Sequence, residues 1–417
     1  RFLDTLELAC VLRSELESHS LAALTNLLFG RGERHRALDD ALDTLAVLTV
    51  LHEEVRAGEH SAPARLLRDL GRTWSWAPLF DSLSTGSRGP SSSRAQGPSV
   101  PPPTSVRGSP SLAATPECVR GVLADEARWQ RVAPGYRVRE EQVELAVALA
   151  SAFREGRAVA AEAGTGVGKT LAYTLVAVLH SLVTKERVVI SSANRTLQER
   201  VVREELPRVC AALGVEQPPS LVLKGRLNYG NPRRARLLCE RPEMLGCEGL
   251  SATARLYTAS FFERCGDRDL QSFGGWLLHN DASVREIRDR ISCQPDCDER
   301  ICRREPGGPC AYLQHLDALE RASVVSINHS LLLRWPARYG AIPRLIIDEA
   351  HELAGEADRA FSEEVRSVEL RTWFNRLAGR RGGGLIGVLG LEKGDLGSSG
   401  RLLGLVQRAG EEMEDVG

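Results

Sequence analysis

Along the first part of the chain, the hydrophobic positions recur with the period of a helix. Over residues 1 to about 80, leucine and alanine return every three or four positions, which places them on one helical face. The clearest run consists of Leu38, Ala41, Leu42, Leu45, Leu48 and Leu51. We therefore expect this region to be mostly helical.

From about residue 118 the pattern changes to short apolar runs that alternate with helical segments. A chain that alternates strands and helices forms a parallel sheet with helices on its faces. The sequence therefore predicts an α/β fold in this region. The runs that we expect to be strands are residues 158–161, 188–191, 221–223, 324–327 and 345–347.

A stretch rich in serine, glycine and proline separates the two patterns. It covers residues 82–117 and includes three consecutive prolines at 101–103. With so few apolar side chains it cannot bury a core, so we predict a disordered linker. The linker divides the chain into an N-terminal unit, residues 1–81, and a second unit, residues 118–417.

Composition restricts the environment of the protein more than its function. The 417 residues carry a formal net charge of −1, so any surface that binds nucleic acid has to be local. The longest apolar stretch, residues 171–183, is too short to cross a bilayer, and no secretory signal opens the chain. We therefore expect a cytoplasmic protein with no membrane partner.

One glycine-rich segment, residues 161–170, has the composition of a phosphate-binding loop. Glycines let several backbone N–H groups converge on a phosphate, and the helix that follows adds its N-terminal dipole. Lys169 is expected to reach the β- and γ-phosphates, and the Thr170 hydroxyl to ligate Mg²⁺. The remaining nucleotide-binding positions of the loop are Ala163, Gly164, Thr165, Gly166, Val167 and Gly168.

A second nucleotide signal follows much later in the sequence. Residues 344–351 read as a buried strand that ends in Asp348 and Glu349. Beside a phosphate-binding loop, the first carboxylate holds Mg²⁺ and the second orients or deprotonates the attacking water. Ala163 departs from the strict loop pattern, which has glycine there, and alanine fits if its φ stays negative. A chance glycine-rich turn explains the loop alone, but it does not explain both signals.

Four of the ten cysteines lie close together in the sequence. Their arrangement is Cys293-x3-Cys297-x4-Cys302-x7-Cys310. A long chain without a secretory signal favours a metal site over disulfides. Closely spaced thiolates suit Zn²⁺ or an iron–sulfur cluster, which sequence alone separates poorly. The alternative is a set of unrelated buried thiols.

These signals, taken in order, resemble the iron–sulfur helicases of superfamily two, of the DinG and XPD type. The resemblance covers roughly residues 120–380 and implies a RecA-like ATP-binding domain. It further implies a cysteine-rich insertion over residues 224–315 and the start of a helical arch over residues 354–417. The segments that carry it, besides the loop and the Asp-Glu-Ala-His strand, are Tyr136, Arg139 and Gln142 (the adenine-reading segment), residues 191–198, 224–229 and 328–332.

The same resemblance favours a [4Fe–4S] cluster over zinc. The family usually places its first cysteine ligand two residues after an Asn-Tyr pair, and this chain has Asn231 there. The fourth thiolate is then Cys293 or Cys239. We choose the compact set of Cys293, Cys297, Cys302 and Cys310. Whether Asn231 abolishes the cluster is left open by the sequence.

The N-terminal unit resembles the last third of a DnaQ-like 3′–5′ exonuclease. In that family a histidine five residues before an aspartate supplies the general base and a metal-binding carboxylate, and His35 and Asp40 have this spacing. The other carboxylates that such a two-metal site needs lie upstream in the family. A solvated helix start is an equally simple explanation of His35 and Asp40 from spacing alone.

Together the resemblances predict an ATP-dependent DNA helicase, acting 5′ to 3′ on single-stranded or forked DNA, fused to an incomplete exonuclease module. His351 is expected to link the nucleotide site to DNA-driven closure. A second RecA-like domain is missing, which together with Arg1 suggests a fragment. The alternatives are a nuclease with an accessory NTPase, a zinc scaffold with a vestigial NTPase and, more weakly, a P-loop kinase. Basic candidates for DNA contact are Lys224, Arg226, Arg233, Arg234, Arg236, Arg303 and Arg304.

Overall fold

The computed structural model describes most of the chain, in two compact units that span Arg1–Leu353 and Ala354–Gly417. Within the second unit only residues 354–362 are described, so the predicted helical arch lies largely outside. His35, Thr165 and residues 81–112 of the predicted linker also lie outside. The described residues are 4–16, 18–32, 36–70, 73–80, 113–164, 166–193, 195–245, 247, 249–305 and 308–362.

A four-stranded parallel sheet lies at the centre of the ATP-binding half. Its strands are β1 (Val188–Ser192), β2 (Ser220–Val222), β3 (Val324–Asn328) and β4 (Arg344–Ile347), in the order β2-β3-β1-β4. All three pairings are parallel, with Val188 opposite both Val324 and Arg344. The α/β fold predicted from the sequence is therefore confirmed, and it is consistent with a RecA-like domain.

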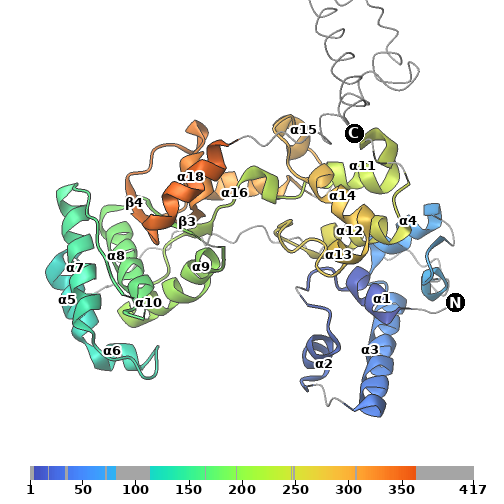
Figure 1. Ribbon diagram of the computed structural model, residues 1–417, viewed down its shortest axis with the longest axis horizontal. Helices are drawn as coiled ribbons and strands as arrows, with labels where there is room; N and C mark the ends of the chain where they lie inside the picture. Colours follow the sequence, from blue (N-terminus) through green and yellow to red (C-terminus); the bar gives the residue numbers. More distant parts are fainter. Residues whose placement is uncertain are drawn as a thin grey trace, which may run out of the picture. The chain divides into compact units, whose positions relative to one another are not determined.

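Helices precede, connect and follow these strands, as Figure 1 shows. Short 3₁₀ turns are η2 (Ala77–Phe80), η4 (Arg226–Asn228), η5 (Pro242–Leu245), η6 (Ala337–Tyr339) and η7 (Ala350–Glu352), and η3 (Val201–Glu205) is a π-helical turn. The α-helices are α1 (Thr5–Leu12), α2 (Leu21–Phe29), α3 (Ala37–Ala57), α4 (Ser61–Leu70), α5 (Pro116–Ala124), α6 (Glu126–Gln130), α7 (Glu140–Glu155), α8 (Lys169–Thr184), α9 (Arg195–Arg200), α10 (Leu206–Leu213), α11 (Pro232–Glu240), α12 (Ala252–Arg264), α13 (Leu277–Asn280), α14 (Ala282–Ile291), α15 (Glu299–Arg303), α16 (Ala311–Leu319), α17 (His329–Leu333) and α18 (Leu353–Phe361).

The two central strands, β1 and β3, are buried on both faces, as the strands of parallel sheets usually are. Val188 and Ile190 of β1 pack into a cluster with α5, α7, α8 and α10. Val189, between them, points to the opposite face and packs with α16 and the cysteine-containing segment. Helix α8 is buried nearly all round, which explains why its sequence from Leu171 onward is almost wholly apolar.

The expected strand at residues 158–161 does not form. These residues are irregular and exposed, and even Val159 keeps 45% of its surface accessible. The segment reads Ala-Val-Ala-Ala, and alanine is depleted in strands because its small side chain packs little surface against neighbours. The other four predicted strands are confirmed within one residue at either end.

The N-terminal helices share a hydrophobic cluster with α11–α14 of the insertion. The cluster contains Leu8 and Val47 from the first group and Leu238 and Phe261 from the second. Helices α1 and α4 lie against α12 (Figure 1). The predicted helical character of residues 1–80 is confirmed. However, only the second half of the predicted run of α3 is packed: Leu38, Leu42 and Leu45 are exposed, whereas Leu51 is buried and Leu48 packs against the cluster. The helix also buries Val47 and Val55.

No helix in the described ranges is long and apolar enough to span a membrane.

Candidate functional site

The phosphate-binding loop is shaped by two glycines with left-handed backbone conformations. Gly166 has φ 79° and Gly168 has φ 92°, whereas Ala163 keeps a φ that an L-residue adopts readily. A Cβ on Gly168 would lie 2.3 Å from Nε2 of Gln142, which donates to the Gly168 carbonyl at 2.8 Å. Because both φ and the close approach of Gln142 exclude a side chain, this position requires glycine.

The residues of the predicted adenine segment brace this loop from α7 and the turn before it. Arg139 donates to the Gly166 carbonyl, and Gln142 is buried. The Tyr136 hydroxyl contacts Oε1 of Gln142 at 3.3 Å and the Leu123 carbonyl at 3.0 Å. Burial, together with the charge of Glu126, raises the pKa of Tyr136 to about 12, so the phenol stays neutral. The structure therefore brings the predicted adenine segment and the loop together.

The loop and the Asp-Glu strand meet at the carboxyl end of the sheet. Asp348 is tied to β1 because its backbone N–H donates to the Ser191 carbonyl at 2.8 Å. Lys169, the first residue of α8, donates from Nζ to Oε1 of Glu349 at 2.9 Å. Ligand sites of open α/β sheets lie at this edge. The predicted amine and carboxylates thus form one constellation.

Tyr173 is a site residue that the sequence analysis missed. It lies one turn after Lys169 on α8, and its hydroxyl donates to Oδ2 of Asp348 at 3.0 Å. The Thr170 hydroxyl also bonds to Tyr173, and burial followed by the charge of Asp348 raises the pKa of this phenol. Tyr173 therefore joins the two expected Mg²⁺ ligands. The spacing of four from Lys169 on a helix is the signal that finds it.

A cavity of about 500 Å³ opens beside the loop. Its walls include Tyr136, Arg139 and Gln142 of the predicted adenine segment and the loop residues Gly166, Gly168, Lys169 and Thr170. Among the lining residues that the sequence analysis did not select are Arg200, Glu205 and Arg208. Arg208 pairs with the buried carboxylate of Glu205 at 2.9 Å. The cavity has the size range of nucleotide and cofactor pockets.

Glu349 has a backbone conformation that is rare outside glycine, with φ 53° and ψ 47°. Such conformations cost about 1–3 kcal/mol and cluster at functional sites. His351 follows on the exposed side, with Nδ1 3.6 Å from Oε2 of Glu349. A second polar contact joins the ends of strands β1 and β3. Oγ of Ser191 and Nδ1 of the buried His329 lie 2.7 Å apart.

The cysteines of the compact set converge in the structure. Cys293, Cys302 and Cys310 are buried, and Cys297 packs against the same cluster. A hydrogen bond from Cys293 lowers the pKa of Cys310 to about 7, and Cys302 also bonds to Cys310. Cys239 is elsewhere: its thiol donates to the Arg255 carbonyl at 3.4 Å, and burial raises its pKa to about 12. The geometry favours Cys293 over Cys239 as the fourth member.

Among the described residues, no three His, Cys, Asp or Glu side chains surround one point as the ligands of a single metal ion do. A four-iron cluster is larger than a single ion, and four cysteine thiolates surround it. The protein sets the net charge of such a site and the hydrogen bonds to the sulfurs. Here four thiols face one another, and two arginines, Arg226 and Arg268, act on the charge of Cys310. The donor set therefore fits such a cluster.

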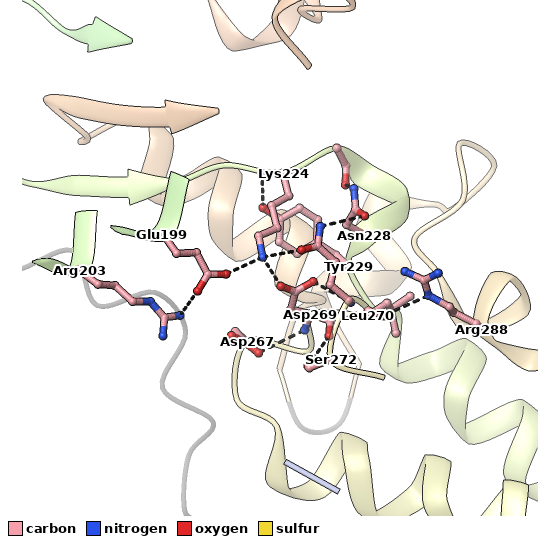
Figure 2. Close-up of polar contacts among 12 residues, drawn as sticks. Glu199, Arg203, Lys224, Asn228, Tyr229, Asp267, Asp269, Leu270, Ser272 and Arg288 are labelled. Atoms are coloured by element: carbon pink, nitrogen blue, oxygen red, sulfur yellow. Dashed lines mark hydrogen bonds and ion pairs between the residues drawn. The ribbon is translucent and has the colours of Figure 1, made fainter. Parts of the chain in front are cut away.

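Some of the basic residues predicted to contact DNA are exposed, and some are paired with carboxylates of the protein. Arg233, Arg236, Arg303 and Arg304 are exposed, although Arg236 pairs with Glu305 at 2.6 Å and Arg303 with Asp317 at 2.9 Å. Lys224 is buried, and Figure 2 shows it between Glu199 and Asp269. With its ammonium held by these carboxylates, Lys224 is not available to a DNA phosphate.

The nuclease-like pair is only half described. Asp40 lies in the first turn of α3 and is partly buried, and His35 lies outside the described residues. The metal site predicted for Asp40 stays a prediction.

Comparison with known proteins identifies relatives for more than half of the chain. An "ATP-dependent helicase DinG" of Mycobacterium tuberculosis (strain ATCC 25177 / H37Ra) is 30% identical over 263 residues, or 56% of this chain and 37% of the relative. An "ATP-dependent DNA helicase YoaA" of Haemophilus influenzae is 39% identical over 248 residues, or 57% and 36%. A "3'-5' exonuclease DinG" of Bacillus subtilis is 26% identical over 278 residues, or 63% and 27%.

No family model matches the chain. The chain spans about a third of the length of these curated relatives. Over more than half of its length the chain is therefore similar to proteins named DinG and YoaA helicases.

Proposed function

We propose that this protein is an ATP-dependent DNA helicase. One observation carries the proposal: two hydrogen bonds, from Lys169 to Glu349 and from Tyr173 to Asp348, join the phosphate-binding loop to the Asp-Glu strand. An amine at the start of a helix and two carboxylates at the end of an adjacent strand are the parts that nucleotide hydrolysis requires. The names of the DinG and YoaA relatives support DNA as the substrate on which this hydrolysis acts.

Each residue of the nucleotide site then has a role. ATP binds with its base toward Arg139 and Gln142 in the cavity beside the loop, and with its phosphates on the backbone from Ala163 to Gly168. Lys169 neutralises the β- and γ-phosphates. Thr170 and Asp348 hold Mg²⁺, and Glu349 orients the attacking water. His351 faces outward beside Glu349, where it can relay DNA-driven closure to that carboxylate.

DNA is proposed to bind as a single strand or a fork, with movement from 5′ to 3′. The exposed guanidinium groups of Arg233 and Arg304 supply local positive charge on a chain whose net charge is close to zero. The full ATP cleft also needs a second RecA-like domain. The N-terminal helices are proposed to belong to a 3′–5′ exonuclease module, as the name of the Bacillus subtilis relative supports.

A [4Fe–4S] cluster is proposed as the resident metal group, held by Cys293, Cys297, Cys302 and Cys310. The convergence of these thiols and the positive charge of the neighbouring Arg226 and Arg268 support it. Such a cluster would hold together the segment between α14 and α16, whose described residues form only the short helix α15.

The nucleotide site is tested by changing the lysines at the two ends of helix α8 in the full-length protein. Lys169→Ala should abolish DNA-stimulated ATP turnover, because no other amine of this site reaches the phosphates. Lys185→Ala is the matched control, since Lys185 is exposed at the far end of the same helix. Turnover is measured by phosphate release at saturating single-stranded DNA.

If Lys169→Ala retained the turnover of the parent, the assignment of the loop would be wrong. The metal assignment is tested separately, by iron and sulfide content after purification without oxygen. About four irons per chain, with matching sulfide, are expected. Stoichiometric zinc, or no metal, would contradict the cluster without affecting the result for Lys169.

A further inference from the structure

Asn231 occupies the position at which the resemblance led us to expect a cysteine ligand, and the backbone places it directly beside Cys293. Gly230 and Ser292 form an antiparallel bridge. On either side of this bridge the Asn231 N–H donates to the Ile291 carbonyl at 2.7 Å, and the Cys293 N–H donates to the Tyr229 carbonyl at 2.8 Å. The two residues therefore enter the cysteine site at the same point.

The side chain of Asn231 has one end fixed by helix α11. Its Oδ1 accepts from the backbone N–H groups of Arg233 at 3.0 Å and Arg234 at 3.2 Å, as an N-cap residue does. Only the oxygen of the amide can accept from these donors, so the orientation of the amide is determined by its partners. The NH₂ group must then point the other way, into the cysteine site.

This NH₂ group donates hydrogen bonds to two cysteine sulfurs. Nδ2 of Asn231 lies 3.2 Å from Sγ of Cys297 and 3.4 Å from Sγ of Cys302. The amide thus accepts two hydrogen bonds and donates two, which uses its whole capacity. Asn231 is only 1% exposed, so water does not compete for these contacts.

We propose that Asn231 is a positioning residue of the metal site, which donates hydrogen bonds to the thiolates of Cys297 and Cys302 while Cys293 supplies the fourth thiolate. This inference rests on the four-iron cluster of the proposed function. Asn231 is then not a lost ligand. Its side chain caps α11 and donates two hydrogen bonds to ligand sulfurs. It does so at the position where the resemblance predicts a cysteine thiolate.

The charges around the cysteine site indicate how the hydrogen bonds from Asn231 act on the reduction potential of the cluster. An oxidised four-iron cluster with four thiolates carries a net charge of about −2, and one-electron reduction adds a further negative charge. Arg226 and Arg268 supply positive charge, and Asn231 adds two N–H dipoles at the sulfurs. Hydrogen bonds to cluster sulfurs stabilise the more negative, reduced state and so raise the reduction potential.

The test compares variants of the full-length protein, purified without oxygen. Asn231→Asp keeps an oxygen that can cap α11 but removes both N–H donors, and Asn231→Ala removes the cap as well. Cys239→Ser is the control, because that thiol lies in a different hydrophobic cluster. Iron and sulfide are measured first. The midpoint potential is then measured by titration with a chemical reductant that supplies the electron, followed in the visible spectrum.

We expect all three variants to retain about four irons. The midpoint should shift to more negative potential in Asn231→Ala, further in Asn231→Asp, and not at all in Cys239→Ser. Asn231→Asp keeps the test valid if the loss of the cap prevents Asn231→Ala from folding. Cys293→Ser should lose the cluster.

Three results would overturn the inference. Unchanged midpoints in both Asn231 variants, with four irons retained, would show that the amide does not act on the thiolates. Loss of iron from a folded Asn231→Ala protein would show that Asn231 holds the cluster in place of tuning it, and a full cluster in Cys293→Ser would remove Cys293 from the ligand set. A parent protein without iron would overturn the cluster itself, a failure that the iron assay separates from the other three.

Discussion

Lys224 offers the sharpest test of the packing in this structure, because a buried ammonium has to be fully paired. Its Nζ donates to Oε1 of Glu199 at 3.0 Å, to Oε1 of Gln271 at 3.2 Å and to a carboxylate oxygen of Asp269 (Figure 2). These three acceptors use its three N–H donors. We predict that Lys224→Met, which keeps the apolar stem and removes the charge, destabilises the segment around it.

The expected magnitude follows from the burial of the partners. A charge pair at 3 Å gains roughly 5 kcal/mol at an effective dielectric constant of about 20, before the cost of desolvation. Removal of one member of a buried pair costs about 3–5 kcal/mol, because the other member stays buried and unpaired. Asp269 keeps only 14% of its side chain exposed, but Glu199 keeps 36% and also lies 3.6 Å from Arg203. We therefore expect the low end, about 3 kcal/mol.

Amide hydrogen exchange measures this effect locally. The Gly230 N–H donates to the Arg268 carbonyl and the Leu270 N–H to the Asn228 carbonyl, both at 2.8 Å, so these bonds open when the two segments separate. A loss of about 3 kcal/mol should speed their exchange about 100-fold, since each 1.4 kcal/mol is a factor of ten. Arg303→Met is the control, because that arginine and its partner Asp317 are both about half exposed and such pairs contribute at most about 1 kcal/mol.

The second test of Lys224 is rescue by its partner. In the Lys224→Met background, Asp269→Asn removes the charge that was left unpaired and should recover part of the lost protection. The reasoning is refuted if Lys224→Met changes exchange by no more than Arg303→Met does. It is also refuted if Asp269→Asn adds a further loss instead of a recovery.

The remaining predictions concern the nucleotide site and the N-terminal helices. Gly168→Ala should abolish nucleotide binding in a titration with ATP, because φ is 92° and the new Cβ would meet Gln142 at 2.3 Å, whereas Gly121→Ala in open space on α5 should leave binding intact. Tyr173→Phe should raise the Mg²⁺ concentration for half-maximal ATP turnover by about 10- to 100-fold, as loss of a ligand-orienting partner does, and an unchanged Mg²⁺ dependence would remove Tyr173 from the site. Burial lowers the pKa of His19 below its ordinary value of 6.5, so its contribution to stability is present above that pH and is lost as the pH falls through the folded pKa. The urea midpoint of the parent should therefore fall on acidification below pH 6.5 by more than that of His19→Asn, and equal slopes would contradict the burial of His19.

The sequence predicts those parts of the fold and site that depend on short spacings. Four strands are found within one residue of their expected bounds, because valine and isoleucine runs between helical patterns have few other structures open to them. The fifth, at residues 158–161, failed because its alanines resemble a strand in apolar character but not in packing surface. The loop is read directly from its glycines, since Gly166 and Gly168 have the backbone conformations that demand them.

Contacts between residues far apart in the chain were not predictable in the same way. Tyr173 meets Asp348 across 175 positions, and Lys224 meets Asp269 across 45. Nothing in the local pattern distinguishes Lys224 from the neighbouring exposed arginines, and only its distant carboxylates explain why it is buried. The ligand choice between Cys239 and Cys293 depends likewise on the bridge at Gly230 and Ser292, which a single sequence does not reveal.

The short segment from β2 to α11 explains how the cysteine site is held to the rest of the fold. Leu223 continues the sheet pattern through its N–H bond to Ser326, and the next residue, Lys224, donates its backbone N–H to the hydroxyl of Tyr229. The Tyr229 carbonyl accepts from Cys293, and Asn231 caps α11 two residues later. Because nearly every second residue of this segment is bonded to a different element, it has little freedom to shift. We therefore expect Lys224→Met to lower the iron content of the proposed cluster, measured after purification without oxygen, as well as to speed local hydrogen exchange, although the acceptors of the Lys224 ammonium are Glu199, Asp269 and Gln271.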